Sequence, residues 1–117
     1  IVICDRFIDS TIAYQVYGKK IKMKFIENIH RYILSGLKPN LTFLLKVSAK
    51  SSSKRLKKRR TKNRYDNFSK NFYSNVQRSF LKIASNKKNY YILDNSNNDS
   101  QIEEKIFNII SKYLKKR

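Results

Sequence analysis

Three short apolar runs, separated by stretches of helical periodicity, limit the folds that this chain can adopt. The runs are residues 1–4, 41–47 and 90–93, and each is too short for a helix. They lack the polar and apolar alternation of a strand with one solvated face. Because strands buried on both faces belong to parallel sheets covered by helices, we expect a three-layer α/β fold.

Helical patterns fill the intervals between these runs. Apolar residues recur at helical spacing in residues 25–33, 72–83 and 102–114. Asp9 or Ser10 is expected to begin a first helix, and Ser48 or a following Ser a short one, since these residue types cap helix N-termini. The second helix is expected to end at Gly36. The result is a single domain over residues 1–117.

The carboxyl ends of parallel strands are where ligands of such sheets bind. One of these ends carries Asp5 and Arg6, and the last carries Asp94. A carboxylate can hold a hydrated Mg²⁺ ion, and a guanidinium can bind a phosphate through two hydrogen bonds. The alternative for Asp5 and Arg6 is an ion pair that fixes a loop.

The charge balance is strongly basic. Lys and Arg number 27 against 8 Asp and Glu, for a net charge of +19, and eight of the eleven residues 54–64 are basic. This run predicts binding of phosphate groups, either in a nucleotide or in nucleic acid, where Tyr65, Phe68 and Phe72 could stack on bases. A hydrophobic content of 40% argues against full disorder. One Cys, no signal peptide and no membrane-length apolar run lead us to expect a cytoplasmic protein without a membrane partner.

Residues 5–15, Asp-Arg-Phe-Ile-Asp-Ser-Thr-Ile-Ala-Tyr-Gln, resemble the Asp-Arg-Tyr segment of thymidylate kinases, which phosphorylate dTMP with ATP. Residues 37–45, Leu-Lys-Pro-Asn-Leu-Thr-Phe-Leu-Leu, resemble the Pro-Asp-Leu-Thr strand of that family. Residues 54–59 resemble the helix before its lid, and residues 63–66, Asn-Arg-Tyr-Asp, the lid itself. The resemblance continues to residues 92–94 and so covers nearly the whole chain.

The resemblance implies a nucleoside-monophosphate-kinase fold of the P-loop type, here incomplete. No G-x-x-x-x-G-K-[ST] motif occurs, and the chain has only two glycines. We therefore expect the C-terminal part of such a kinase, inactive alone. The resemblance places the missing central first strand between those of residues 1–4 and 41–47.

Individual roles also follow from the resemblance. Arg6 resembles the arginine that binds the dTMP phosphate, and Asp5 the acid near Mg²⁺, which it contacts directly or through water. Thr11 and Gln15 match positions near the thymine edge, and Tyr14 matches the tyrosine beside the 2′ carbon of the sugar. A polar helix face for Thr11 and Gln15, and a core position for Tyr14, are the alternatives.

Arg59 and Arg64 resemble lid arginines that approach ATP, in a lid of about residues 57–68. The expected catalytic set is Asp5, Arg6 and Arg64, acting with Mg²⁺ and ATP on dTMP. Dimers are common in this family, so a homodimer through the helix of residues 25–33 is an expected partner arrangement. No specific nucleic acid is expected.

Some positions depart from the family pattern. Phe7 and Asn40 stand where Tyr and Asp are common, and Val16, Lys20 and Arg60 occupy positions often held by Gly. Because Gly adopts backbone angles that other residues resist, we expect local departures in loop geometry there. Two alternatives stay open: a deoxynucleoside kinase, which also carries an Asp-Arg motif, and a basic nucleic-acid-binding module.

Overall fold

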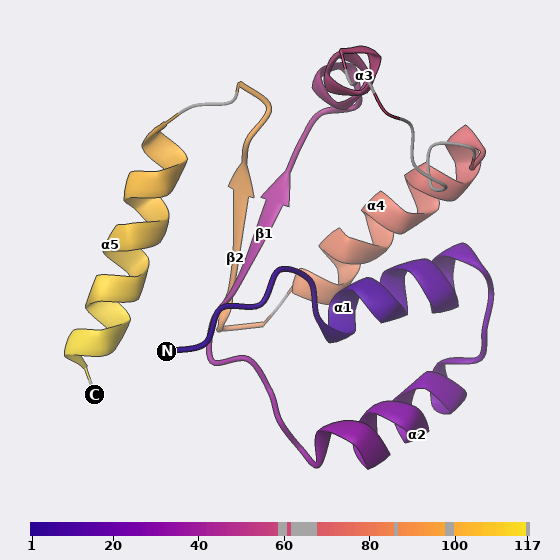
Figure 1. Cartoon of the computed structure of the whole chain (residues 1–117), viewed down its shortest axis with the longest axis horizontal. Coiled ribbons are helices and arrows are strands. Elements are labelled where there is room, and N and C mark those ends of the chain that lie inside the picture. The colour runs from indigo at the N-terminus through magenta and orange to yellow at the C-terminus, as the bar shows by residue number, and fades with distance from the viewer. Residues whose placement is uncertain (59–60, 62–67, 86, 98–99, 117) are drawn as a thin grey trace. The chain divides into compact units, whose positions relative to one another are not determined.

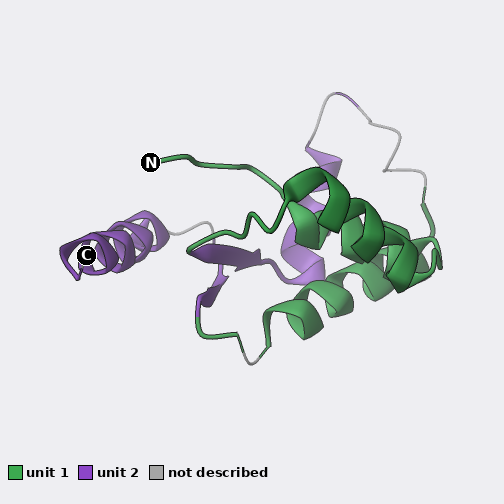
Figure 2. Cartoon of the chain, turned by 90° about the horizontal axis from the view of Figure 1, so that it is seen from below, with its two compact units in different colours: residues 1–40, 63–88 green, residues 41–62, 89–117 purple. Residues whose placement is uncertain are grey.

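The computed structural model describes residues 1–58, 61, 68–85, 87–97 and 100–116. They divide into two compact units, residues 1–40 with 63–88 and residues 41–62 with 89–117 (Figure 2). We call these the helical unit and the sheet unit. The lid arginines Arg59 and Arg64 lie outside the described residues.

The helical unit contains α1 (Ile8–Thr11), η1 (Ile12–Gly18), α2 (Met23–Leu34) and α4 (Lys70–Ala84). Figure 1 shows α1 running directly into η1. The helical patterns of residues 25–33 and 72–83 are confirmed by α2 and α4. A small core forms where η1 packs on α4, with Ala13 and Val76 buried.

The turn of η1 is wider than the predicted α-helix. The Lys19 N–H donates to the Tyr14 carbonyl oxygen at 2.9 Å, which is the i to i+5 spacing of a π-helix. Gly18 ends this helix against α4: a Cβ atom there would lie 2.6 Å from Phe72 Cε2 and 3.2 Å from Val76 Cγ2. The absence of a side chain at Gly18 therefore permits the close approach of η1 and α4.

The sheet unit contains two parallel strands, β1 (Thr42–Lys46) and β2 (Tyr90–Asp94), each followed by a helix. They lie side by side in Figure 1, with Thr42 opposite Tyr90 and Lys46 opposite Asp94. The helices are α3 (Ala49–Lys57) and α5 (Gln101–Lys115). Both later strands and their parallel pairing are thus confirmed.

Serine caps begin two of the helices. Ser48 Oγ accepts a hydrogen bond from the Ser51 N–H at 3.2 Å, as expected for α3, and Ser69 Oγ accepts one from the Phe72 N–H at 3.2 Å in α4. The predicted cap at Asp9 or Ser10 is wrong, since α1 already begins at Ile8 without a side-chain cap.

The strand predicted for residues 1–4 does not form. Ile1, Val2 and Ile3 are 98%, 89% and 89% exposed. A strand needs a hydrogen-bonded neighbour, and the described part of the helical unit contains no strand to pair with it. The predicted burial of β1 and β2 on both faces is also wrong here, because Leu45 and Ile92 are exposed.

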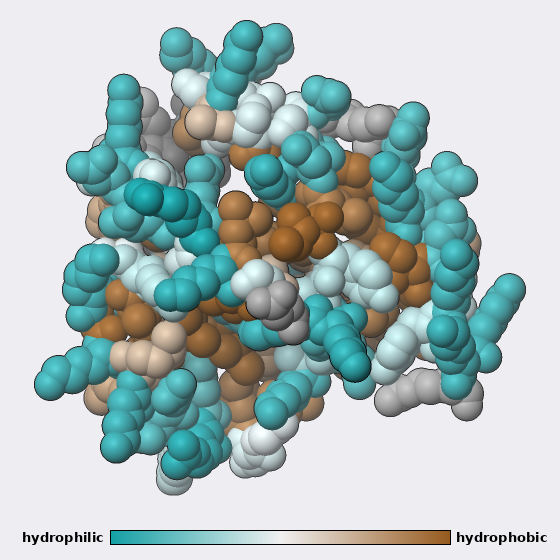
Figure 3. All heavy atoms as spheres, turned by 180° about the vertical axis from the view of Figure 1, so that it is seen from behind, coloured by the Kyte–Doolittle hydropathy of each residue, from teal (hydrophilic) through white to brown (hydrophobic). Residues whose placement is uncertain are grey.

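Hydrophilic side chains cover much of the face drawn in Figure 3. Figure 3 shows one face on which hydrophilic side chains project from most segments, with apolar atoms exposed between them. Within the residues that the structure describes, no helix has the length and apolar character to cross a membrane.

Candidate functional site

Five of the predicted site residues lie on one continuous stretch of the helical unit. Asp5 and Arg6 precede α1 and are exposed, whereas Thr11, Tyr14 and Gln15 lie on α1 and η1 and are half-buried. The stretch thus offers a carboxylate and a guanidinium just before the helices and three polar groups on them. The structure gives no placement for Arg59 or Arg64.

Arg6 is constrained in both its backbone and its side chain. Its φ of 68° lies in the left-handed region, which costs a residue with a Cβ atom about 1 kcal/mol. The guanidinium carbon lies 5.6 Å from the centre of the Tyr14 ring, within range of a cation–π interaction. The guanidinium is therefore held beside η1.

Tyr14 is held in turn by two rings of α4. Its ring centre lies 6.1 Å from that of Phe72 and 6.2 Å from that of Phe80, with the latter pair edge to face at 75°. Such tilted contacts are favourable arrangements of aromatic rings. Tyr14 therefore packs on α4 but is only half-buried, and its contact with a sugar stays a prediction.

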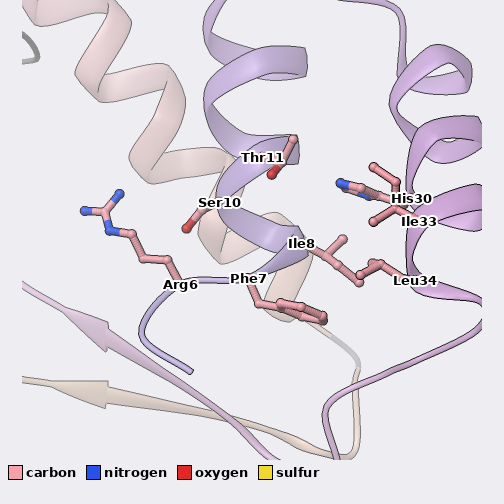
Figure 4. A pocket seen from close by; sticks show the side chains of 8 residues that line it. All are labelled: Arg6, Phe7, Ile8, Ser10, Thr11, His30, Ile33 and Leu34. Atoms are coloured by element: carbon pink, nitrogen blue, oxygen red, sulfur yellow. The ribbon is translucent and has the colours of Figure 1, made fainter. Parts of the chain in front are cut away.

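An open pocket of about 360 Å³ lies between the start of α1 and α2. It is lined by Arg6, Phe7, Ile8, Ser10, Thr11, His30, Ile33 and Leu34. In Figure 4 the Arg6 guanidinium points away from the α2 side chains. The pocket therefore joins Thr11 and the stem of Arg6 to a mainly apolar wall, whereas Tyr14 and Gln15 do not line it.

His30 of α2 lines the pocket, although the sequence alone did not connect it with the site. Its helical spacing placed it on α2, and no motif related it to Asp5 or Arg6. Only the packing of α2 beside α1 brings it to the same pocket.

One departure from the family pattern has a visible consequence. Lys20, at a position where Gly is frequent, adopts a φ of 64°. The backbone here keeps a left-handed conformation although the residue carries a side chain. The end of α2 follows expectation, with left-handed Ser35 and Gly36 closing the helix.

The carboxyl end of the sheet carries a hydrogen-bonded cluster. The Ser96 N–H donates to Asp94 Oδ1 at 2.8 Å, and the Ser48 N–H donates to Ser96 Oγ at 2.9 Å. Hydrogen bonds from the Ser96 side chain and backbone, aided by the Lys46 charge, hold the pKa of Asp94 below its usual value. The sequence pointed to this edge but not to Ser96.

Arg55 of α3 also makes a hydrogen bond at this edge of the sheet. Its Nη2 donates to the Asn95 carbonyl oxygen at 2.7 Å, and the Asn95 N–H donates to the Lys46 carbonyl oxygen at 2.7 Å. These bonds extend the strand pairing by one residue beyond β2. Arg55 therefore stabilises the loop after β2. Its position in the basic run of the sequence did not predict this role.

Among the predicted site residues of this stretch, Asp5 is the one whose carboxylate could hold Mg²⁺. No group of three or more His, Cys, Asp or Glu side chains is poised to hold a metal within the described ranges. Mg²⁺ at nucleotide sites usually keeps its waters and is held by one or two carboxylates together with substrate phosphates. An exposed Asp5 next to Arg6 fits that mode of binding.

The described residues thus define an α/β protein, with a two-stranded parallel sheet in one unit and a constrained arginine before a helix in the other. The family model for thymidylate kinase matches residues 1–106. The chain therefore belongs to the thymidylate kinase family, whose nucleoside-monophosphate-kinase fold is α/β, in agreement with the two-stranded parallel sheet and its helices.

Individual thymidylate kinases are similar to this chain over nearly its whole length. Thymidylate kinase of Sulfurihydrogenibium sp. (strain YO3AOP1) is 37% identical over 117 residues, which cover 100% of this chain and 55% of the relative. That of Trichodesmium erythraeum (strain IMS101) is 33% identical over 114 residues, covering 97% and 51%. That of Staphylococcus epidermidis (strain ATCC 12228) is 37% identical over 117 residues, covering 98% and 58%. The chain spans about half the length of the curated relatives it matches.

Proposed function

We propose that this chain supplies the dTMP-binding and lid portion of a thymidylate kinase, which transfers the γ-phosphoryl group of ATP to dTMP and forms dTDP in the cytoplasm. The family match over residues 1–106 carries this proposal, and the constrained Arg6 supports it. The portion that binds the ATP phosphates would come from the residues that relatives carry beyond the matched span. In the complete three-layer sheet, a central strand from that portion would lie beside β1.

Phosphoryl transfer depends on positioning and on stabilisation of charge more than on covalent chemistry by the protein. Arg6 would hold the dTMP phosphate in line with ATP, and Arg59 and Arg64 would neutralise charge that develops between the two phosphates. Mg²⁺, held near Asp5 directly or through water, would supply further charge neutralisation.

Recognition of the nucleoside is assigned to η1 and its neighbour. The Thr11 hydroxyl and the Gln15 amide can each donate and accept hydrogen bonds at the thymine edge. Tyr14 against the 2′ carbon would disfavour a ribose hydroxyl. Replacement of Tyr14 by Ala should then narrow the preference for dTMP over its ribose counterpart, measured as a ratio of kcat/KM values.

The decisive test uses the completed enzyme, which is this chain joined to the phosphate-binding-loop portion found in its relatives. With ATP and Mg²⁺ we expect it to convert dTMP to dTDP, measured by chromatography of the nucleotides. The 117 residues alone should form no dTDP, because their sequence has no cradle for the ATP phosphates. Phosphorylation of thymidine in place of dTMP would contradict this function and favour a deoxynucleoside kinase.

The net charge of +19 also supports a second candidate, a nucleic-acid-binding module. A lid has a few residues with specific tasks, whereas an electrostatic arm shares its contribution over all its charges. Arg59→Ala and Arg64→Ala should depress dTMP phosphorylation, and Lys57→Ala and Lys62→Ala should matter little. Equal losses of nucleic-acid affinity at all four positions near physiological salt would favour the module.

Homodimer formation is proposed through α2. Phe25, Tyr32 and Ile33 expose 58%, 88% and 67% of their surface, an unusual share for apolar residues on one helix. Sedimentation of the completed enzyme should show a dimer, and Tyr32→Glu should convert it to a monomer. A monomeric wild-type enzyme would contradict this assignment.

A further inference from the structure

A row of aromatic rings in the helical unit ends at the Arg6 guanidinium. Phe68 stacks on Phe72, with ring centres 4.2 Å apart and planes inclined by 18°. Phe72 contacts Tyr14, and Phe80 contacts the same Tyr14 ring from farther along α4. Tyr14 then meets the Arg6 guanidinium at 5.6 Å. The row thus connects the first residues of α4 to the group proposed to bind phosphate.

The half-buried Phe72 ring packs closely against the end of η1. Its backbone N–H is capped by Ser69 Oγ at the start of α4, and its ring lies against Gly18, where a Cβ atom would be only 2.6 Å away. On the neighbouring turn of α4, Val76 is 3% exposed, and its Cγ2 atom would lie 3.2 Å from a Cβ atom at Gly18. This close packing against η1 gives Tyr14 a defined surface to contact, although the Phe72 ring is only half-buried.

We propose that Phe72 and Phe80 are positioning residues for the phosphate-binding arginine, acting through Tyr14. An exposed arginine loses rotamer entropy when it binds a phosphate. If the Tyr14 ring already restricts the guanidinium, much of that entropy is lost before the ligand arrives, and binding is tighter. This proposal rests on the proposed function, because it assumes that Arg6 binds the acceptor phosphate.

The role predicts an effect specific to the phosphate group. Thymidine and dTMP differ only in the 5′ phosphate, so the ratio of their dissociation constants measures how well the completed enzyme uses that group. A general loss of packing weakens both ligands by the same factor and leaves the ratio unchanged. A misplaced Arg6 weakens dTMP alone.

The experiment is calorimetric titration of the completed enzyme with dTMP and with thymidine. The measured quantity is the dissociation constant for thymidine divided by that for dTMP. Phe72→Leu and Phe80→Leu should each lower this ratio by about threefold, which is the effect of losing one exposed cation–π interaction. Phe72→Tyr, which keeps a ring at this position, should retain the wild-type ratio. Phe43→Leu is the matched control, because Phe43 belongs to the sheet unit and stacks there on Tyr91, with ring centres 5.6 Å apart.

The outcomes separate the two proposals. An unchanged ratio in both leucine variants overturns the positioning role, and either variant suffices for a decision if the other fails to fold. An equal fall of the ratio in Phe43→Leu also overturns it, since the effect would then come from general packing. A wild-type enzyme that binds thymidine as tightly as dTMP contradicts the proposed function itself.

Discussion

The helical unit and the sheet unit hold their charged side chains by different means. In the helical unit, Arg6 lies against Tyr14, whose ring contacts two rings of α4. In the sheet unit, Asp94 is held by hydrogen bonds from Ser96, and the loop after β2 by one from Arg55. One unit uses the faces and edges of rings, and the other uses short directional bonds.

The difference follows from the groups that are held. A guanidinium on a long, flexible stem can rest on the electron-rich face of a ring and keep its donors available for a ligand. A carboxylate at the end of a parallel strand is an acceptor, so N–H and O–H donors of the next turn satisfy it. The helical unit should therefore respond to changes of volume, and the sheet unit to the loss of single donor atoms.

The largest expected effect concerns Arg6. In the completed enzyme, Arg6→Ala should lower kcat/KM for dTMP by about 10² or more, because a charge-assisted phosphate contact is lost where water is excluded. Arg31→Ala, an exposed position on α2, is the control and should change kcat/KM by less than roughly twofold. Steady-state kinetics measures both. Similar kcat/KM values for Arg6→Ala and the wild type would show that Arg6 does not bind the dTMP phosphate.

The packing of η1 on α4 should be sensitive to one added methyl group. Gly18→Ala places a Cβ atom 2.6 Å from the Phe72 ring and should lower the free energy of unfolding of the completed enzyme by about 1–3 kcal/mol, measured in urea. The double variant Gly18→Ala, Phe72→Leu should lose less than the sum of the single losses, because the smaller side chain makes room. Additive losses would show that the two positions do not contact.

Helix caps should behave alike in the two units, because a cap acts within one turn. Ser48→Ala and Ser69→Ala should each destabilise the first turn of their helix by about 1 kcal/mol. Hydrogen exchange at the Ser51 and Phe72 amides, which lose their acceptors, should become about fivefold faster. Ser53→Ala, within α3, serves as the control and should leave exchange at Ser51 unaltered. If the increase in exchange rate differs widely between the two cap variants, tertiary packing and not the cap determines the stability of these first turns.

The smallest expected effect is a shift in the pKa of Asp94 in the sheet unit. Ser96→Ala should raise the pKa of Asp94 toward 3.8, because the hydroxyl of Ser96 makes the largest contribution to lowering it. The lowered pKa means that the Asp94 carboxylate favours the folded state above pH 3.8, and that this contribution is lost as the pH falls below that value. Carbon NMR of the Asp94 carboxyl measures the pKa. Lys46→Met should shift it less, and the reverse order would contradict the hydrogen-bonded account.

Local patterns predicted most elements of the fold. The apolar runs that became β1 and β2, and the helical spacing that became α2, α4 and α5, depend on neighbours a few residues away. The Ser48 cap is equally local. The strand of residues 1–4 could not be decided in this way, because an apolar run becomes a strand only when another strand offers it hydrogen bonds.

For the site, the sequence determined the residue types and their order: an Asp-Arg pair, then Thr11, Tyr14 and Gln15 on one helical stretch, together with the family to which they belong. The tertiary structure decided which of these residues contact each other. The Arg6–Tyr14 contact, the two α4 rings behind Tyr14, and His30 in the pocket join segments that local spacing does not relate. The physical reason is that such contacts depend on the relative placement of helices, which is set by packing at a few close approaches such as that of Gly18 and Phe72.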